Sequence, residues 1–186
     1  MASLEDERYR DLNDHVKGRL ATFQCERSPH LQRFARERVS AWESSGHSRT
    51  YVFLVPHDEH GVDVAAFFTI GMTSLDFSAA SRSLQKKLMG NISTSTTGAY
   101  SLAELARDDR YASDDIPGQL ILEQAMQVVS RARTLVAGRF LVVDAQRAVF
   151  DHLYEPAGFK EVTVAKPPAG MEDRDFITAC CVIKDL

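Results

Sequence analysis

The sequence predicts one domain of the mixed α/β class, and three observations lead to this prediction. The chain has 186 residues, which fits a single domain of about 100–200 residues with a sizeable core. Hydrophobic residues make up 44% and charged residues 26% of it, a composition typical of globular proteins. Short apolar runs rich in β-branched residues alternate with segments of helical periodicity. We therefore expect a central sheet flanked by helices.

The N-terminal part begins with a polar segment over residues 1–20, where a short helix and a loosely ordered arm are both open. Residues 21–25 (ATFQC) are expected to form a first edge strand. Ser28 and Pro29 then supply a cap and a first-turn proline, and helical spacing continues to Glu43. The apolar face of this helix, which we expect to lie on the core, consists of Leu31, Phe34, Ala35, Val39 and Trp42.

A hairpin and an insert are expected next. Apolar runs over 50–56 and 62–72 flank the loop HDEHGVD and predict two paired strands. Gly71 interrupts the second strand, and such a glycine often marks a bulge or a close approach of another backbone. Residues 74–98 then change pattern, with a helix followed by the polar loop NISTSTTG. Inserts of this kind often carry substrate-facing loops.

The second half alternates strands and helices. A strand is expected over 100–106, followed by the loop RDDRYASDDIPG and the longest helix over 118–136. A strand over 139–143 leads to a helix over 146–154, which Asp144 is expected to cap. The apolar positions of that helix are Ala148, Val149, Leu153 and Tyr154.

The chain is expected to end in two strands. Pro156 and Gly158 stop the preceding helix, since glycine tolerates the left-handed backbone of a C-terminal turn. Strands are then expected over 159–164 and 176–184. Cys180 and Cys181 lie within the last of these and are expected to be small core residues.

Composition also narrows the compartment and the kind of site. No run approaches the roughly 18 apolar residues of a membrane span, and the polar, acidic N-terminus lacks the pattern of a signal peptide. The three cysteines are odd in number, so no disulfide framework is indicated, and no zinc-type spacing appears. We expect a cytoplasmic protein with neither a membrane partner nor a metal.

The charge pattern bears on nucleic acid as a partner. The net charge is −4, which gives no global attraction to a polyanion. The region around the first predicted helix is nevertheless locally basic. Its arginines are Arg27, Arg33, Arg36, Arg38 and Arg49. A solvated helix face is the usual explanation of such a cluster, and contact with phosphate or an acidic partner is the alternative.

Five segments carry a family resemblance. AFFTIG, LARD, PGQLILEQA, AGRFLVVDA and LYEPAGF follow one another along the chain, and in this order they resemble the toxin-like, mobile-element branch of the GNAT superfamily of acyl-CoA-dependent N-acyltransferases. The resemblance covers most of the chain. It implies the GNAT fold, in which a twisted mixed sheet is flanked by helices and splayed between two central parallel strands. It also implies one domain over 1–186, with an arm over 1–20 and an insert over 74–98.

The resemblance also implies an acetyl-CoA site. In the family the backbone after the central strand contacts the pantetheine and the thioester, and a glycine-rich loop before the long helix binds the pyrophosphate. Here two of the expected glycines are absent from RYASDDIPG, where Asp114 and Asp115 stand instead. The positions that correspond to the cofactor-binding residues are Leu105, Ala106, Arg107, Arg110, Ile116, Pro117, Gly118 and Gln119.

The implied reaction is direct attack of a primary amine on the acetyl thioester. Tyr154 corresponds to the family's tyrosine near the thioester and is the candidate acid for the leaving thiolate, with a buried aromatic anchor as the alternative. For the amine proton, Glu104 acting through water, an ordinary strand carboxylate at that position and proton loss to bulk water are all open.

The acceptor and the partners are less defined. Aminoacyl-tRNA is conceivable but not favoured by the acidic net charge, and a small-molecule or protein amine is equally allowed. A homodimer is left open. Because the two loop glycines are missing, the alternative function is a GNAT-fold binding or regulatory module without catalysis.

Overall fold

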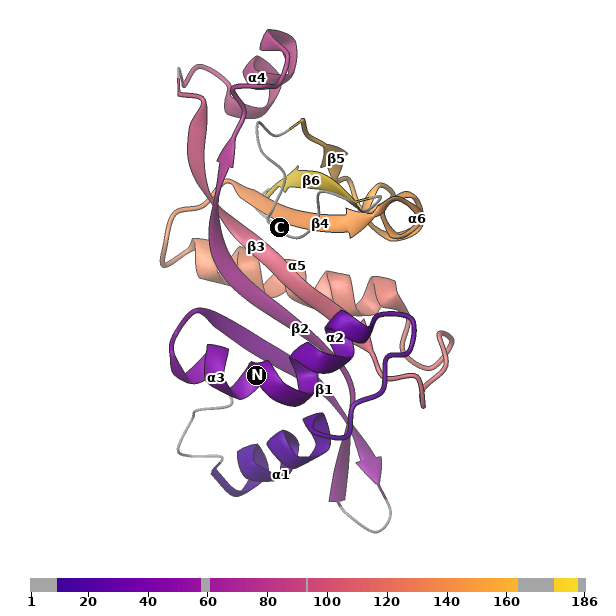
Figure 1. Cartoon of the computed structure of the whole chain (residues 1–186). Coiled ribbons are helices and arrows are strands. Elements are labelled where there is room, and N and C mark those ends of the chain that lie inside the picture. Colours follow the sequence, from indigo (N-terminus) through magenta and orange to yellow (C-terminus); the bar gives the residue numbers. More distant parts are fainter. Residues whose placement is uncertain (1–9, 58–60, 93, 164–175, 184–186) are drawn as a thin grey trace. The chain divides into compact units, whose positions relative to one another are not determined.

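The structure is a computed structural model in which residues 10–57, 61–92, 94–163 and 176–183 are described. Its six-stranded mixed sheet has the order β1-β2-β3-β4-β6-β5 (Figure 1). The strands are β1 Ser48–His57, β2 Gly61–Asp76, β3 Thr96–Arg107, β4 Phe140–Gln146, β5 Lys160–Glu161 and β6 Phe176–Val182. Within this sheet β3 and β4 are parallel, whereas β1 with β2, β4 with β6 and β5 with β6 are antiparallel.

The chain forms two compact units, and each is described by itself. The first comprises Met1–Gly71 and Leu102–Ala125, and the second Met72–Ser101 and Met126–Leu186. Three elements therefore contribute to both units, namely β2, β3 and the long helix α5 (Gly118–Arg133). The single domain expected over residues 1–186 stays a prediction.

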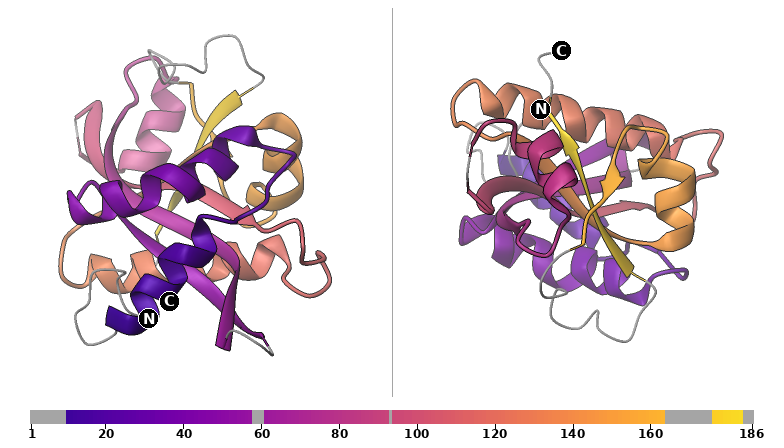
Figure 2. Two further views of the ribbon diagram at one scale, coloured as in Figure 1. Left: turned by 60° about the horizontal axis from the view of Figure 1, so that its bottom comes forward. Right: turned by 90° about the horizontal axis from the view of Figure 1, so that it is seen from above.

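In the first unit, helices cover the strands. The N-terminal helices are α1 Arg10–Leu20, α2 Pro29–Arg33, the π-helical η2 Phe34–Arg38 and α3 Val39–Ser44. They lie on one face of the strands, and the first half of α5 lies on the other (Figures 1 and 2). Phe67 of β2 is central to the helix-covered core, paired with Val52 of β1 and in edge contact with Phe23 at 5.1 Å between ring centroids. Burial of these large side chains holds the helices on the sheet.

The second unit has its own apolar core. It contains α4 (Arg82–Met89), the second half of α5, β4, the short α6 (Arg147–Val149), the π-helical η3 (Phe150–Tyr154), β5 and β6. Phe77 and Phe140, both 0% exposed, meet edge to face at 5.4 Å. The Arg139 guanidinium donates from Nε to the Leu88 carbonyl at 2.8 Å, which attaches the end of α4 to the start of β4. The parallel ladder of β3 with β4 joins Tyr100 to Leu141 and Ser101 to Val142.

Two expectations for the N-terminal part are wrong. Residues 21–25 form a connection rather than a strand, because Phe23 is buried in the core and the Gln24 and Cys25 N–H groups donate to side chains of Asp108 and Gln32. The helix after Ser28 is correct, and its Ser28 cap accepts from the Leu31 N–H. Trp42, however, is 41% exposed. A π-helical turn over Phe34–Arg38 separates it from the first apolar positions and rotates it off the core face.

Of the two alternatives at Gly71, the bulge is absent, whereas another backbone does come near, since a Cβ at Gly71 would lie 3.5 Å from the His47 carbonyl oxygen. Gly71 pairs regularly with Ser48, and the register of β1 with β2 shifts instead at Phe53 and Leu54, where Ala65 is the additional residue on β2. The other strand and helix expectations are confirmed, with shifted ends: β2 runs on to Asp76 and α5 ends at Arg133.

The helix after β4 also differs from expectation. Asp144 does not cap it, because β4 continues to Gln146 and the Asp144 carboxylate accepts a hydrogen bond from the Thr178 hydroxyl of β6. The π-helical turn changes which side chains face inward, so that Phe150 and Tyr154 are buried whereas Ala148 and Val149 are exposed. Gly158 has φ = 92°, as the turn prediction requires.

Three further expectations concern the cysteines, the ends of two strands and membrane spans. Cys180 and Cys181 are buried thiols of β6, as expected, and Cys25 is buried too. The expected strand ends at Val164 and Lys184 lie outside the described residues. Among the helices of the described part of the chain, none has the length and apolarity needed to span a membrane.

Candidate active site

The end of β3 presents three of the predicted cofactor residues in the first unit. Leu105, Ala106 and Arg107 are the last residues of the strand, and Ala106 is buried in the core with Phe67. The Arg107 guanidinium donates from Nη1 to the Ile116 carbonyl at 3.0 Å. This side chain therefore closes the loop between β3 and α5.

The loop begins with a buried carboxylate. Asp108 is 0% exposed and accepts the Arg110 N–H and Nε at 2.9 and 2.8 Å, and the Gln24 N–H at 3.0 Å. Its own N–H donates to the Ala65 carbonyl of β2 at 2.9 Å. The first residues after β3 are thus attached both to the sheet and to the connection between α1 and α2.

Arg110 joins Asp108 to a second buried carboxylate, Asp63. Its Nη2 lies 2.7 Å from Asp108 Oδ2 and its Nη1 lies 2.8 Å from Asp63 Oδ2. Asp63 also contacts Arg19 at 2.9 Å and accepts the Tyr111 hydroxyl at 3.1 Å. We call Arg19, Asp63, Asp108, Arg110 and Tyr111 the loop clamp.

The loop clamp determines the ionisation of Asp63. Burial alone would raise the pKa of this carboxyl group, but hydrogen bonds from Arg19, the Val64 N–H and Tyr111 and the charge of Arg110 outweigh burial and lower the pKa to about 2. The neighbouring Asp108 in turn raises the pKa of the Arg110 guanidinium, chiefly by the hydrogen bond that it accepts and also by its charge. Arg110, a predicted cofactor residue, therefore directs its donors at two carboxylates of its own chain.

The remaining predicted cofactor residues lie at the start of α5. Ile116 is 7% exposed, and its N–H donates to the Ala112 carbonyl at 3.2 Å, while Asp115 accepts the Ala112 N–H. The helix begins at Gly118, directly after Pro117, and the Gln119 side chain donates to Glu123 one turn on. Side-chain hydrogen bonds thus shape a loop from which two family glycines are absent.

Tyr154, the predicted acid, belongs to the second unit. It ends η3 and is 6% exposed. Its ring meets that of Phe159 edge to face at 5.3 Å, and the Tyr154 carbonyl accepts the Phe159 N–H at 3.1 Å. The tight turn at Gly158 brings the two aromatic residues together.

One pairing was not anticipated from the sequence. Glu104 of β3 and His30 of α2 lie 2.9 Å apart, Oε1 to Nε2, and 74 residues separate them in the chain. The Glu104 side chain is 13% exposed and that of His30 is 53% exposed. No sequence spacing signals this contact, because it arises when α2 folds over the end of β3.

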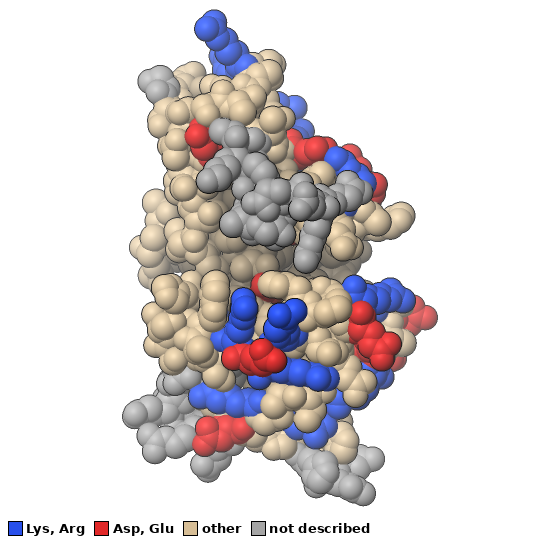
Figure 3. All heavy atoms as spheres, viewed as in Figure 1, with Lys and Arg blue, Asp and Glu red and all other residues tan. Residues whose placement is uncertain are grey.

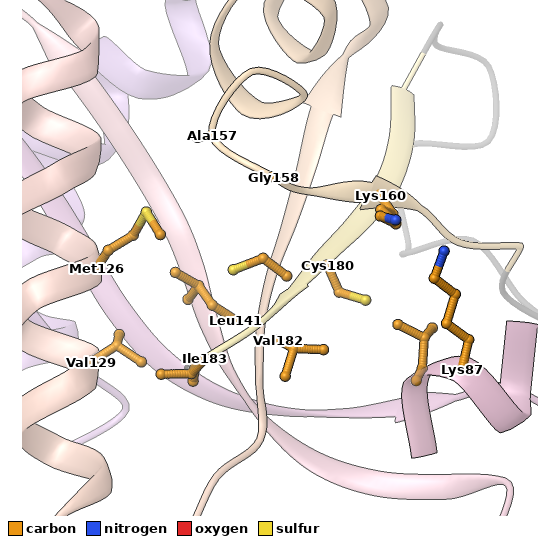
Figure 4. Close-up of a pocket in the computed structure, with 12 residues that line it drawn as sticks. Lys87, Met126, Val129, Leu141, Ala157, Gly158, Lys160, Cys180, Val182 and Ile183 are labelled. Carbon is orange, nitrogen blue, oxygen red and sulfur yellow. The ribbon is translucent and has the colours of Figure 1, made fainter. Parts of the chain in front are cut away.

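A cavity lies within the second unit. Its volume is about 400 Å³, and Figure 4 shows Met126, Val129 and Leu141 on one side of it and Lys87 and Lys160 on another. None of the predicted cofactor residues lines it.

The cysteines at this cavity are not reactive groups at neutral pH. Burial raises the pKa of Cys180 to about 12 and that of Cys181 to about 11. Both thiols therefore stay protonated near pH 7.

The first unit carries the basic face that the sequence indicated. The side chains of Arg27, Arg33, Arg36, Arg38 and Arg49 are exposed. Figure 3 shows basic side chains gathered over the face on which α2 and α3 lie, with some acidic ones among them. Within this face Arg36 donates to the Phe23 carbonyl and Arg49 to Glu43.

The chain was compared with known proteins. No protein-family model and no curated protein matches it.

Among the described residues, no three side chains of His, Cys, Asp or Glu are grouped as metal ligands would be.

Solved structures do match. The chain resembles a bacterial toxin with a TM-score of 0.71 at 17% identity, over 90% of this chain and 84% of the toxin. It resembles a tyrosine-to-phenylalanine mutant of KacT with a TM-score of 0.68 at 18% identity, over 88% and 87% of the two chains. It also resembles AtaT complexed with acetyl-methionyl-tRNAfMet, with a TM-score of 0.63 at 21% identity, over 86% and 85%. AtaTR has also been solved with bound AcCoA. The chain thus has the mixed α/β fold of these solved structures, as its sequence predicted.

Proposed function

We propose that this protein transfers an acetyl group from acetyl-CoA to a primary amine. The observation that carries the proposal is the shared fold with AtaTR, which was solved with AcCoA and covers 88% of this chain. The residues that resemble the family's cofactor and acid positions fall at the end of β3, at the start of α5 and at the end of η3. No metal takes part in the proposed reaction.

The cofactor would be held mainly by backbone groups of the first unit. We assign the pantetheine and the thioester carbonyl to the backbone of Leu105, Ala106 and Arg107. The pyrophosphate would bind at the start of α5, where Gly118 and Gln119 present N–H groups and the helix dipole favours an anion. Ile116 and Pro117 shape the approach to this helix end.

Arg110 has a different role in this proposal from the one expected at first. Because its guanidinium donates to Asp63 and Asp108, it would order the loop rather than contact the pyrophosphate. The loop clamp then does what the glycine-rich turn does elsewhere, namely hold the backbone ready for the anion.

Tyr154 is proposed as the acid that protonates the leaving thiolate of CoA. A phenol O–H can donate to sulfur, and a proton delivered during C–S cleavage avoids release of a free thiolate. Both KacT and AtaT were solved as tyrosine-to-phenylalanine mutants, which supports a tyrosine of functional interest in proteins of this fold.

We place aminoacyl-tRNA first among the acceptors. The net charge of −4 counts against this, but charge acts locally, and the five exposed arginines on and around α2 to α3 offer a phosphate-binding face. A solved structure of AtaT contains acetyl-methionyl-tRNAfMet. A small-molecule or peptide amine is the competing acceptor.

The first test is the melting temperature with and without acetyl-CoA. A ligand at 100 times its dissociation constant adds about 2.7 kcal/mol of stability, which raises the melting temperature by several degrees in a domain of this size. Transfer from radiolabelled acetyl-CoA to charged total tRNA is then measured against uncharged tRNA and spermidine. Label on charged tRNA alone supports the tRNA acceptor, and label on spermidine alone contradicts it.

The second candidate is a binding module without catalysis. The absent loop glycines favour it. No change in melting temperature at millimolar acetyl-CoA would support this candidate and contradict the transferase.

A further inference from the structure

We propose that the His30–Glu104 pair accepts the proton that the attacking amine loses. This inference rests on the proposed acetyl transfer and names a further residue pair for it. It starts from the 2.9 Å contact between His30 Nε2 and Glu104 Oε1, which joins a helix end to the strand that carries the proposed thioester contacts.

Glu104 is placed for such a role by its strand. It directly precedes Leu105, Ala106 and Arg107 on β3, whose backbone we assign to the pantetheine and thioester. Its side chain is 13% exposed, and a carboxylate so far removed from water needs a hydrogen-bonding partner. His30 is that partner.

His30 supplies the atom that takes the proton. His30 is the second residue of α2 and directs its Nε2 at Glu104. In the neutral ring with the proton on Nε2, the other nitrogen, Nδ1, carries a lone pair. The His30 side chain is 53% exposed, so a proton taken up at Nδ1 can pass on to water. In pairs of this kind the carboxylate orients the imidazole and stabilises its protonated form.

Burial and neighbouring charges act on Glu104 in opposite directions. Burial raises the pKa of Glu104, and the hydrogen bond and charge of His30, together with the charge of Arg38 on η2, act in the opposite direction. Burial outweighs these contributions, so the pKa of Glu104 is raised overall.

The reaction balances as follows. The neutral amine attacks the thioester carbonyl carbon, the C–N bond forms and the C–S bond breaks. The nitrogen gives one proton to His30 Nδ1, and the sulfur takes one from the Tyr154 hydroxyl. The products are an amide and the CoA thiol. His30 then loses its proton to water, and Tyr154 regains one from water.

A purely structural ion pair between α2 and β3 is the competing explanation. It predicts that removing the pair lowers stability and leaves catalysis intact in the folded fraction. The proposed role predicts a loss of turnover with little change in the apparent KM for acetyl-CoA.

The experiment compares His30→Gln and Glu104→Gln with the wild type, using charged total tRNA and spermidine as acceptors. Loss of a general base typically costs 100-fold or more, so we expect kcat to fall about 100-fold in His30→Gln. The KM for acetyl-CoA should stay within about twofold of the wild-type value. The rise in melting temperature that acetyl-CoA causes should stay within about a degree of the wild-type rise. His30 is largely exposed, so this variant should fold normally.

The pH profile separates the two explanations further. The dependence of kcat on pH is measured for wild type and for both variants. This dependence should change in His30→Gln, whereas the ionisation of the amine substrate is the same for both proteins. Glu37→Gln, an exposed carboxylate on η2, is the matched control and should keep the wild-type profile.

Each outcome decides the matter. Transfer by wild type with an unchanged kcat and pH profile in both variants would overturn the pair and leave the acetyltransferase standing. If wild type shows no transfer to either acceptor although acetyl-CoA raises the melting temperature, the proposed function fails and the pair fails with it.

Discussion

Tyr154 ends a π-helical turn, and this local geometry decides where its side chain goes. The Glu155 N–H reaches back five residues to the Phe150 carbonyl at 2.9 Å, which widens the helix and turns both aromatic rings inward. Such turns recur at functional positions in proteins. The buried ring of Tyr154 is then held against the ring of Phe159.

The prediction for this residue is a loss of turnover without a loss of binding. Tyr154→Phe keeps the ring and its contact with Phe159 but removes the donor, so kcat should fall by about 10- to 100-fold and the dissociation constant of acetyl-CoA should change little. Steady-state kinetics and isothermal calorimetry measure the two quantities. An unchanged kcat would exclude Tyr154 as the acid.

Asp63 gives a prediction for stability and pH. Its pKa of about 2, lowered from 3.8, corresponds to a contribution on the order of 2 kcal/mol. That contribution is complete above pH 4 and is lost as the pH falls towards 2. In urea unfolding, Asp63→Asn should therefore be less stable than wild type at pH 7, and the difference should shrink towards pH 2.

The matched control for Asp63 is Asp114→Asn. Asp114 is exposed on the loop between β3 and α5, which Asp63 holds through Arg110 and Tyr111, so the stability of Asp114→Asn should equal that of wild type at both pH values. A difference between Asp63→Asn and wild type that does not depend on pH would mean that packing, not ionisation, explains the loss.

The connection before β4 is decided by element packing rather than by turn chemistry. Gly138 faces the ring of Tyr100 on β3, and a Cβ at Gly138 would lie 2.9 Å from Cδ2 of that ring and closer still to Cε2. Tyr100 is 3% exposed and donates its hydroxyl to the Val136 carbonyl at 2.5 Å. The ring therefore has little room to give way.

Gly138→Ala should consequently destabilise the second unit. Overpacking of this kind costs about 1–3 kcal/mol, measured as a lower midpoint of urea unfolding. Gly98→Ala is the control, since a Cβ there meets nothing within 4 Å. Equal midpoints for the two variants would contradict the predicted clash.

The element order was predictable, but several element ends were not. Apolar periodicity located the hairpin and the long helix, because burial of one face imposes a repeat on the sequence. The two π-helical turns carry no such signal, so Trp42 was wrongly assigned to the core and Val149 to an inward face. Asp144 was wrongly assigned as a cap because β4 gains three more residues, Asp144 to Gln146, by pairing with β6.

At the scale of the whole molecule, charge is distributed unevenly. The net charge is −4, yet the arginines around α2 and α3 form a basic face on the first unit. The net charge of the chain therefore does not predict what this face can bind, because screening limits electrostatic attraction to about 8–10 Å.

If charged tRNA is the acceptor, reversing charge on this face should weaken its binding. Arg27→Glu combined with Arg33→Glu should lower the affinity for tRNA by at least 10-fold at low salt and reduce the slope of log K against log salt. The melting temperature and its response to acetyl-CoA should not change. Arg131→Glu, an exposed substitution on α5, is the control, and equal losses in the two proteins would argue against a specific face.

The sequence by itself determined the fold class, the order of the strands and helices, and the segments that resemble the GNAT-type toxins. It could do so because hydrophobic repeats, turn residues and short motifs are local properties of the chain. It also selected Tyr154 and the residues from Leu105 to Gln119 as the candidate site, and their roles stay predictions.

Only the tertiary structure decided which charged side chains meet. The contacts of Arg110 with Asp63 and of His30 with Glu104 join residues 47 and 74 positions apart. They depend on how α2, β2 and β3 pack, and no spacing in the sequence encodes a distance of that kind. For the same reason the sequence did not show that Arg110 donates to Asp63 and Asp108 of its own chain, since buried carboxylates need such partners; its role toward the cofactor stays a prediction.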